Sequence, residues 1–551
     1  MPSRIGDWWL SLNVYVRRRI AVGGALLALV AALAALVIAI AAPGGSSGPP
    51  PDDAIGLVPA EALAYLHLYL EPGTGQYEDA SEVAGRLPAL RDLAVMAMLG
   101  QLPGPGGGAP DFERDIRPWF GGQASLALLP ARGPAAREVE LLQAADARAA
   151  RAYVARSLAA PTHAFTRSGV EITVDDHGVA AALARGFLVI GTRSAVASVV
   201  DTATGARRSP SLAADPAAEA ALVELPGPGI ADAYLSRAGM AKLVAHPGGA
   251  LAELSPFLDP GASRGAAAIL SADPDGLELE IRSVLDPKRA AARPGFFSAF
   301  PAFTPTLDAR LPPGTLAYAG FGDPGAVVAS LLGQARREAP GLASEVRGFL
   351  RRASALAGGG ATQLLEALGD EAAVALERGG SGPYAMGLAS GVDPAGAQAA
   401  LTRLEGPIAR ALGRGASADV ASPGFQSQTI AGVPARELQA PRNTEIAYAV
   451  FDGTLVAGTD PAAIATAREG PGDLDGSEAF AAATDGFPER PSLIAYLDLN
   501  DLIRLAAAAG LAANPAYAAL APDLQRLGSF GLAVTSGPSL LSSSARLTIL
   551  R

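Results

Sequence analysis

One strand-like pattern occurs twice in the sequence, as LVPAEALAYLHLYLEP at Leu57–Pro72 and as LPPGTLAYAGFGDP at Leu311–Pro324. Four further pairs of similar segments follow in the same order, with offsets of roughly 250 to 270 residues. These pairs are Trp119–Leu129 with Ala367–Glu377, Gly186–Ser194 with Gly453–Pro461, Ile230–Val244 with Leu493–Ala507, and Gly265–Val284 with Gly528–Leu547. Five pairs in one order predict a duplicated lobe of about 250 residues, with the boundary near residues 301–310.

Within each lobe, the local signals indicate an α+β fold. Short apolar runs predict strands, and an Ala-Tyr pair recurs inside them, at Tyr65, Tyr234, Tyr318, Tyr448 and Tyr496. Asp-Pro pairs predict helix starts, because the carboxylate accepts from the free amides of the first turn and proline loses no bond there. Such pairs occur at Asp323-Pro324, Asp393-Pro394 and Asp460-Pro461.

Turn residues between these strands predict hairpins, as at Asp176-His177-Gly178 and Asp452-Gly453. The predicted fold class is therefore α+β: an N-terminal single transmembrane helix, then two duplicated lobes of mainly antiparallel sheet with helices packed on one face. A doubly wound parallel sheet is the alternative, and it is disfavoured because the hairpins are too many and the connections too short.

The segment 20–42, IAVGGALLALVAALAALVIAIAA, contains no charge over 23 residues. At 1.5 Å per residue, a helix of this length crosses a hydrocarbon core of about 30 Å. Arg17, Arg18 and Arg19 precede it and no Lys or Arg follows until Arg86, so the N-terminus is predicted to be cytoplasmic. A cleavable signal peptide is the alternative, because Ala39-Ile40-Ala41 has the small-x-small form. An uncleaved anchor is favoured, since signal peptides carry apolar runs of only about 7–15 residues.

The predicted organisation follows from the anchor and the repeat. It comprises a cytoplasmic N-terminus (1–19), a transmembrane helix (20–42), a Gly/Ser/Pro linker (43–55), a first ectodomain lobe (56–300) and a second lobe that repeats the first (301–551). The expected location is the cell membrane, with a single pass and the C-terminal ectodomain outside. The lipid bilayer, contacted through residues 20–42, is the first expected partner.

The composition excludes several classes of function. Cysteine is absent, which rules out disulfides, thiolate nucleophiles and cysteine-ligated metal sites. The chain has 43 Lys and Arg against 54 Asp and Glu, a net charge of -11, which argues against a nucleic-acid partner. An ectodomain without disulfides must be stabilised by core packing, and roughly 500 residues suffice for that.

Together, these features resemble the bacterial domain-of-unknown-function family 3352. The resemblance rests on the anchor, the Pro/Ser/Gly linker, the strand VPAEALAY at Val58–Tyr65 and the strand–Asp–helix unit at Ala495–Leu502. It covers residues 56–551 and implies a membrane-anchored, extracytoplasmic protein without an established activity. It supplies no catalytic pattern that could be carried over to this chain.

The four histidines show no spacing typical of metal ligands; they are His67, His163, His177 and His246. His67 alternates with leucines in YLHLYL, so we interpret it as lying on the less buried face of a strand rather than in a metal site. His177 lies in the sequence DDHG, where a hairpin turn is favoured over a metal ligand.

Three further motifs are better explained by structure than by chemistry. The pattern G-x-S-x-G occurs at Gly44–Gly48, in the linker, without the strand and helix of a nucleophile elbow. The glycine clusters 104–108 and 358–360 lack the strand–helix context of a dinucleotide site. Asp473, Asp475 and Glu478 supply only part of a calcium loop, and Ser477 is predicted to cap a helix instead. The sequence thus predicts no catalytic, cofactor-binding or metal-binding residue and no cofactor.

Three functions are compatible with this sequence. The leading hypothesis is a non-enzymatic, membrane-anchored ectodomain that binds or scaffolds an envelope protein or a lipid at the cell envelope. The second is a carrier of an apolar, lipid-like ligand held between the two lobes. The third is an envelope hydrolase that uses paired carboxylates, because two Asp or Glu residues distant in the sequence can meet in space.

Overall fold

A computed structural model describes residues 52–71, 73–99, 102–131, 136–206, 210–227, 229–244, 254–336, 363–380, 382–413, 424–440, 444–469 and 472–551. Across these ranges, no helix is both long and apolar enough to cross a membrane. The predicted anchor 20–42 and residues 43–51 of the linker lie outside the described residues.

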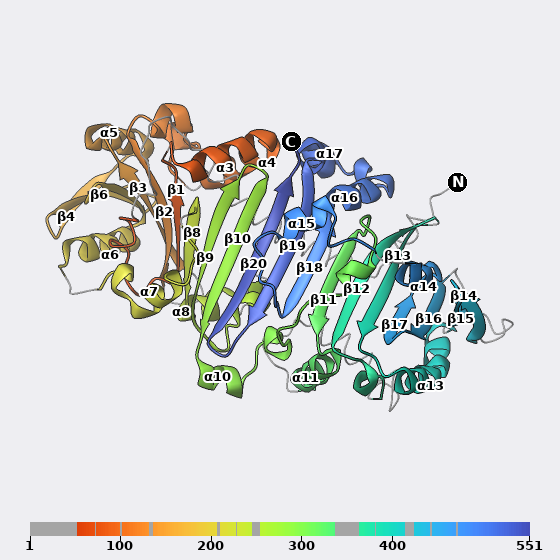
Figure 1. Ribbon diagram of the computed structural model, residues 1–551. Helices are drawn as coiled ribbons and strands as arrows, with labels where there is room; N and C mark the ends of the chain where they lie inside the picture. The colour runs from red at the N-terminus through yellow and green to blue at the C-terminus, as the bar shows by residue number, and fades with distance from the viewer. Residues whose placement is uncertain are drawn as a thin grey trace. The chain divides into compact units, whose positions relative to one another are not determined.

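The described chain divides into two compact units, which are shown in Figure 1. The N-terminal unit comprises 52–286, Ala518–Arg526 and Ile549–Arg551. The C-terminal unit comprises Pro287–Tyr517 and Leu527–Thr548. In both units helices accompany a large antiparallel sheet, so the predicted α+β class with mainly antiparallel pairing is confirmed.

The described part of the N-terminal unit forms one run of antiparallel pairings. In the order in which neighbours pair, its strands are β4 (His163–Arg167), β5 (Val170–Val174), β6 (Val179–Ala184), β7 (Phe187–Thr192), β3 (Ala136–Ala144), β2 (Phe120–Pro130), β1 (Ala64–Tyr69), β8 (Ala231–Ser236), β9 (Ser263–Asp273) and β10 (Gly276–Leu285).

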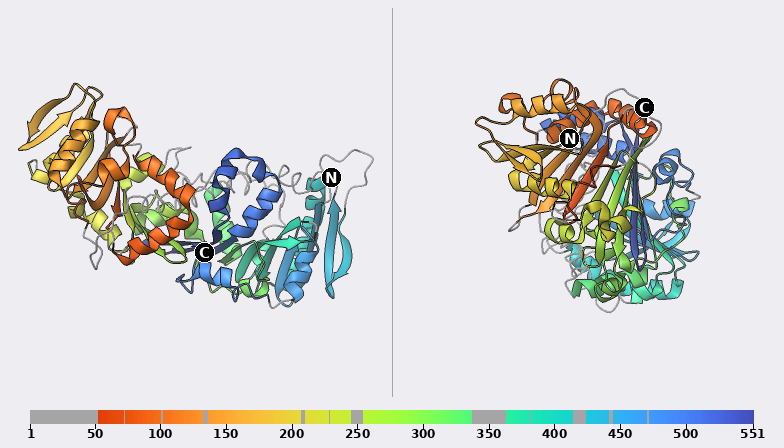
Figure 2. Two further views of the ribbon diagram at one scale, coloured as in Figure 1. Left: turned by 90° about the horizontal axis from the view of Figure 1, so that it is seen from above. Right: turned by 90° about the vertical axis from the view of Figure 1, so that its left-hand side faces the viewer.

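The C-terminal unit has the same order of pairing, strand for strand. Its strands are β14 (Gln426–Ile430), β15 (Val433–Ala440), β16 (Thr444–Phe451), β17 (Thr454–Gly458), β13 (Gly382–Ser390), β12 (Glu371–Gly379), β11 (Ala317–Gly322), β18 (Leu493–Asp498), β19 (Leu527–Ser536) and β20 (Leu540–Ile549). The hairpin β14–β15 ends this order and forms an outer edge of the unit, in cyan in Figure 2.

The helices alternate with these strands along the chain. They are α3 (Gly75–Arg86), α4 (Pro88–Leu99), α5 (Ala147–Ser157), α6 (Arg193–Thr204), α7 (Pro216–Leu222), α8 (Arg237–Gly239), α9 (Ser255–Leu258), α10 (Pro287–Ala292), α11 (Pro324–Arg336), α13 (Pro394–Gly413), α14 (Ala462–Glu469), α15 (Glu478–Thr484), α16 (Leu499–Ala508) and α17 (Pro515–Leu524).

The predicted helix starts are confirmed. Asp323, Asp393 and Asp460 each accept hydrogen bonds from backbone N–H groups in the first turn of a helix. Ser477 caps α15, because its hydroxyl accepts from the backbone N–H of Phe480 at 3.3 Å. The loop that resembled part of a calcium site therefore leads into a capped helix.

The two predicted hairpin turns are also confirmed. His177 is exposed in the turn between β5 and β6, and the Asp175 carboxylate accepts from its backbone N–H at 3.0 Å. Asp452 and Gly453 connect β16 to β17 with positive φ angles of 48° and 69°. Two consecutive residues with positive φ match the twist of the flanking strands, which explains the Asp-Gly pair at this position.

The prediction that helices cover one face of the sheet is wrong for the C-terminal unit. Ala447 and Ala449 of β16 belong to a core cluster that includes residues of α14 and α15. Tyr448, between them, belongs to a second cluster that includes Ala397 and Leu401 of α13. Successive side chains of a strand point to opposite faces, so helices lie on both sides of this part of the sheet.

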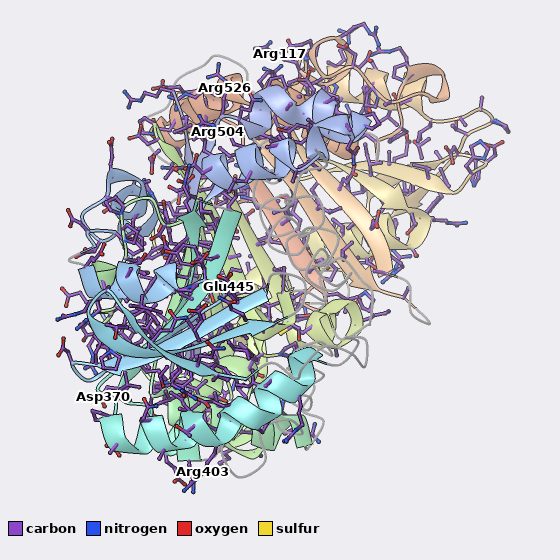
Figure 3. The ribbon with its side chains drawn as sticks, turned by 90° about the vertical axis from the view of Figure 1, so that its right-hand side faces the viewer. Arg117, Asp370, Arg403, Glu445, Arg504 and Arg526 are labelled. Atoms are coloured by element: carbon purple, nitrogen blue, oxygen red, sulfur yellow. The ribbon has the colours of Figure 1, made fainter. Side chains whose placement is uncertain are left out.

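Charge on α13 is confined to the outer side of the helix and to one ion pair. Arg403 on α13 is exposed and extends away from the ribbon, as does Arg504 on α16 (Figure 3). Glu405 lies under Arg436, which donates two hydrogen bonds of 2.7 Å to its carboxylate. The Tyr448 hydroxyl also donates to Glu405 at 2.7 Å, which connects α13 to β16.

Candidate functional site

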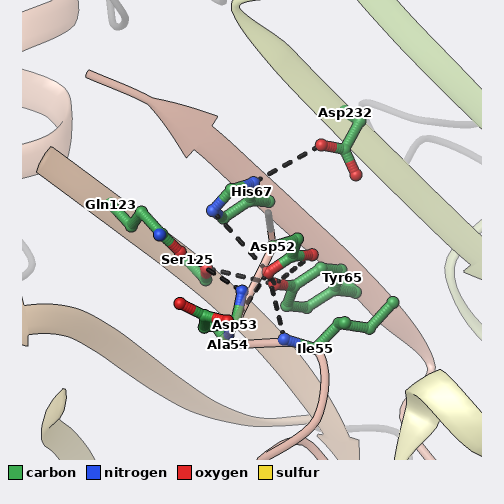
Figure 4. A network of polar contacts seen from close by, with 9 residues as sticks. All are labelled: Asp52, Asp53, Ala54, Ile55, Tyr65, His67, Gln123, Ser125 and Asp232. Carbon is green, nitrogen blue, oxygen red and sulfur yellow. Dashed lines mark hydrogen bonds and ion pairs between the residues drawn. The ribbon is translucent and has the colours of Figure 1, made fainter. Parts of the chain in front are cut away.

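Strands β1 and β8 place a histidine opposite an aspartate in the middle of the N-terminal sheet. In the antiparallel register, Tyr65 pairs with Tyr234 and His67 pairs with Asp232. Tyr65, His67 and Tyr69 are two residues apart, so their side chains share one face of β1. Asp52, twelve residues before β1, lies against the same face through contacts with Tyr65 and His67 (Figure 4).

Asp52 is held in place by three donors. Its Oδ1 atom accepts from the backbone N–H groups of Ala54 and Ile55, each at 3.1 Å. The Tyr65 hydroxyl lies 2.8 and 2.9 Å from the two carboxylate oxygens of Asp52 and 3.2 Å from the Ser125 hydroxyl. The local turn and the buried tyrosine therefore fix the direction of the carboxylate (Figure 4).

His67 lies between two carboxylates. Its Nδ1 atom is 3.4 Å from Asp232 Oδ1, and its Nε2 atom is 3.6 Å from Asp52 Oδ1. The imidazole is 0% exposed, yet neither ring nitrogen makes a hydrogen bond within the described part of the chain. Both separations exceed the usual 2.7–3.2 Å of an N–H···O bond. The cluster is thus buried, polar and incompletely satisfied.

The electrostatics of the cluster oppose full ionisation. Burial alone lowers the pKa of His67, but the Asp232 and Asp52 carboxylates outweigh it and raise that pKa above its ordinary value. Burial raises the pKa of Asp52, and the charge of His67 opposes this rise. Burial also holds the pKa of Tyr65 well above its usual range, which keeps the hydroxyl a neutral donor. A proton therefore tends to remain in this cluster.

The donor set suits a divalent cation. One ligand atom each from Asp52, His67 and Asp232 lie within 4.8 Å of one another. An imidazole with two carboxylates matches the nitrogen and oxygen ligands of zinc and of related transition metals. Without a cation, a protonated His67 would lie as an imidazolium between the Asp52 and Asp232 carboxylates.

The prediction that His67 lies on the less buried face of its strand is wrong. The alternation in YLHLYL does reflect a strand, but its polar and aromatic members, not its leucines, share the face that Asp52 covers. Leu66 on the opposite face is only partly buried, whereas His67 is completely buried. The strand pattern gave no sign of this, because Asp52 and Asp232 are brought to His67 by the tertiary fold.

The C-terminal unit has the same register without the cluster. There, Tyr318 pairs with Tyr496, and two residues further along Gly320 pairs with Ile494. A β-carbon on Gly320 would lie 2.4 Å from the Tyr318 hydroxyl, so the tyrosine occupies the space above this glycine. This pairing of strands therefore does not require a histidine or an aspartate at these positions.

Of the remaining histidines, His163 on β4 is exposed and His177 occupies its turn, while His246 lies outside the described residues. The G-x-S-x-G stretch at Gly44–Gly48 also lies outside them, as does the glycine cluster 358–360.

A second feature is an open depression of about 480 Å³ at the start of α6. Its two arginines already have partners in the described chain. Arg167 donates to Asp201 at 2.8 Å, and the Arg193 guanidinium lies 4.6 Å from the centre of the Phe165 ring. These contacts account for both charges without a ligand.

Two carboxyls outside the cluster are strongly perturbed. Burial raises the pKa of Glu140 on β3 to about 8, with a smaller contribution from the charge of Glu138. Burial raises the pKa of Glu377 on β12 to about 7, although a hydrogen bond from Thr315 opposes the rise. Glu140 belongs to the N-terminal unit and Glu377 to the C-terminal unit.

Comparison with known proteins identifies the family. The model for a protein of unknown function, DUF3352, matches residues 20–548, nearly the whole chain. The chain belongs to the DUF3352 family. None of the curated proteins matches the sequence. Among solved structures, crystal forms I, III and IV of TP0453 share 11–12% identity with this DUF3352 protein. They cover 42–43% of this chain and 79–80% of their own, with TM-scores of 0.24–0.25.

Proposed function

We propose that this DUF3352 protein is a non-enzymatic binding or scaffolding ectodomain, held at the outer face of the cell membrane by residues 20–42. The uncharged segment, the three arginines before it and the absence of basic residues directly after it support this topology. The family match begins at residue 20, the first residue of that segment. We further propose that the two units arose by duplication, which their shared order of strand pairing supports.

The observation that carries the proposal is the junction at Asp52. Directly after the linker, Asp52 is bonded to the turn at Ala54 and Ile55 and to Tyr65 of the sheet. Only residues 43–51 then remain between the proposed anchor and the folded unit. Fully extended, these residues span at most about 30 Å. The N-terminal unit would therefore remain close to the bilayer, where a scaffold for envelope partners must act.

The raised pKa values of Glu140 and Glu377 do not require a catalytic pair. Burial is the main cause of both, and the charge of Glu138 adds to the rise at Glu140. Glycosidases use two carboxyls within about 10 Å of each other, on either side of a substrate. Ligand atoms of Asp52 and Asp232 do lie within 4.8 Å of each other, but His67 lies between these carboxylates, a set of groups that favours binding.

Chemical crosslinking in intact cells tests the binding function. The full chain would be purified from detergent-solubilised membranes after crosslinking. The control would carry residues 1–51 fused to an unrelated soluble domain, so that it shares the anchor but not the ectodomain. We expect at least one envelope protein or lipid to crosslink to the full chain and not to the control. Identical sets of crosslinked species would contradict the proposed function.

A further inference from the structure

We propose that Asp52, His67 and Asp232 form a binding site for one divalent transition-metal ion in the N-terminal unit. This inference does not depend on the membrane tether or on an envelope partner. It concerns residues to which the sequence pattern assigned no chemical role, and it rests on burial, donor chemistry and the difference between the two units.

His67 is fully buried without a hydrogen bond in the described chain. A fully buried imidazole normally satisfies both nitrogens, because leaving a buried polar atom without a hydrogen bond costs about 1–3 kcal/mol. Here both nitrogens lack a hydrogen bond in the described chain, and Asp232 Oδ1 lacks one as well. Nδ1 and Asp232 Oδ1 lie 3.4 Å apart, and a cation between them would be a partner to both.

The spacing of the donor atoms is compatible with a bound ion. Zinc binds nitrogen and carboxylate oxygen at about 2.0–2.2 Å, so two ligands of a tetrahedral ion lie roughly 3.4 Å apart. His67 Nδ1 lies 3.4 Å from Asp232 Oδ1, which is close to that value and longer than a hydrogen bond, while Asp52 Oδ1 lies 3.6 Å from the other ring nitrogen. One ligand atom each from the three residues lies within 4.8 Å of the other two. A cation would bind one ring nitrogen, and small movements of the two carboxylates would complete its ligand set.

The two aspartates lie on the solvent side of the cluster. Whereas the His67 side chain is 0% exposed, the Asp52 and Asp232 side chains are 13% and 11% exposed. Both aspartate side chains are therefore partly exposed, although Asp232 Oδ1 itself is buried, and they mark the side from which a hydrated ion could arrive. His67 forms the inner wall of the site, and a water molecule could complete the coordination on the solvent side.

The strand pairing does not need the side chains of His67 and Asp232. The C-terminal unit pairs β11 with β18 in the same register, with Gly320 and Ile494 at the positions of His67 and Asp232. A buried charged cluster that the strand pairing does not require is a candidate for function. A bound ion would also join the segment at Asp52 to β1 and β8.

Isothermal titration of the full, untagged chain in detergent with Zn²⁺, after removal of metals by a chelator, tests the site. We expect one strong binding event per chain. His67→Gln and Asp232→Asn are each expected to weaken it about 100-fold or more. His177→Gln is the matched control, because His177 lies 3.7 Å from Asp176 in an exposed turn. That variant should bind Zn²⁺ as the wild type does.

Two further readouts separate loss of the site from loss of the fold. Circular dichroism must show that the His67→Gln and Asp232→Asn variants are folded. If one of them is not, the Asp52→Asn variant is tested in its place. Co²⁺ should give the wild type a visible absorption band that the site variants lack. The proposal is overturned if the wild type binds no Zn²⁺, or if a folded site variant binds it as tightly as the wild type. The crosslinking experiment has a different readout, so either proposal can fail alone.

Discussion

At the scale of single residues, Tyr65 of the N-terminal unit and Tyr318 of the C-terminal unit occupy the same register position but differ in the partners of their hydroxyl groups. The Tyr65 hydroxyl contacts Asp52 and Ser125, all within 3.2 Å. The Tyr318 hydroxyl of the C-terminal unit is buried and has no hydrogen bond within the described residues. The two tyrosines therefore bury similar rings but differ in the partners of their hydroxyl groups.

We expect Tyr65→Phe to lower the free energy of unfolding by about 1–3 kcal/mol, because Asp52 loses its buried donor. Tyr318→Phe is the matched control and should change it by less than about 0.5 kcal/mol, or stabilise, since no hydrogen bond is lost. Urea denaturation of the full chain in the presence of a chelator measures both. Equal losses in the two variants would show that the Tyr65 hydroxyl adds nothing beyond its ring.

Glu140 should make stability depend on pH. Its pKa is raised from 4.5 to about 8 in the folded chain, so the folded state holds a proton there that the unfolded state releases above pH 4.5. The stabilisation this proton provides is present below about pH 4.5 and is lost as the pH rises toward 8. Glu140→Gln should remove this dependence and be more stable than the wild type at pH 9, by roughly 2–4 kcal/mol.

Unfolding of both proteins by urea at pH 5 and at pH 9 tests this prediction. Glu171→Gln is the control, because Glu171 is exposed on β5. Its stability should change with pH as that of the wild type does. If Glu140→Gln and the wild type lose the same stability between these two pH values, the Glu140 carboxyl is not the protonated group that the structure indicates.

At the scale of secondary-structure elements, local chemistry decides where helices begin. Asp146 accepts from the backbone N–H groups of Arg148 and Ala149, at 2.8 and 3.0 Å, at the start of α5. Thr192 precedes α6 without a hydrogen bond from its side chain to that helix. Only the first of these two residues satisfies the free amides of a first turn.

Asp146→Ala should therefore destabilise the chain by about 1 kcal/mol, whereas Thr192→Ala should be nearly neutral. The midpoints of thermal or urea unfolding of the two variants provide the comparison. A loss for Thr192→Ala as large as that for Asp146→Ala would contradict the role assigned to the Asp146 carboxylate.

Such local features were predictable from the sequence, and long-range ones were not. The Asp-Pro helix starts, the Ser477 cap and the turn at Asp452-Gly453 depend on neighbouring residues only. Around Tyr448, helices pack on both faces of the sheet. The sequence does not specify which helix packs on which face, because an alanine-rich helix can pack on either one. The cluster at His67 depends on the register between β1 and β8, which no local pattern specifies.

At the scale of the whole molecule, the chain combines two units with one order of strand pairing, and only the first contains the Asp52–His67–Asp232 cluster. Each strand pairing within the N-terminal unit corresponds to a pairing within the C-terminal unit whose labels are ten higher, as β1–β2 corresponds to β11–β12 and β1–β8 to β11–β18. His67 and Asp232 stand where the C-terminal unit has Gly320 and Ile494, a difference at single strand positions that composition and periodicity could not reveal.

The central claim is that residues 20–42 cross the membrane and place the described units outside. Because the chain has no cysteine, a single introduced cysteine reports its own position without background. Ser3→Cys precedes the proposed anchor, and Glu489→Cys lies at an exposed position of the C-terminal unit. In intact cells, a membrane-impermeant maleimide should label Glu489→Cys and not Ser3→Cys, and both should be labelled after lysis at the mass of the uncleaved chain. Labelling of Ser3→Cys but not Glu489→Cys in intact cells would contradict the account.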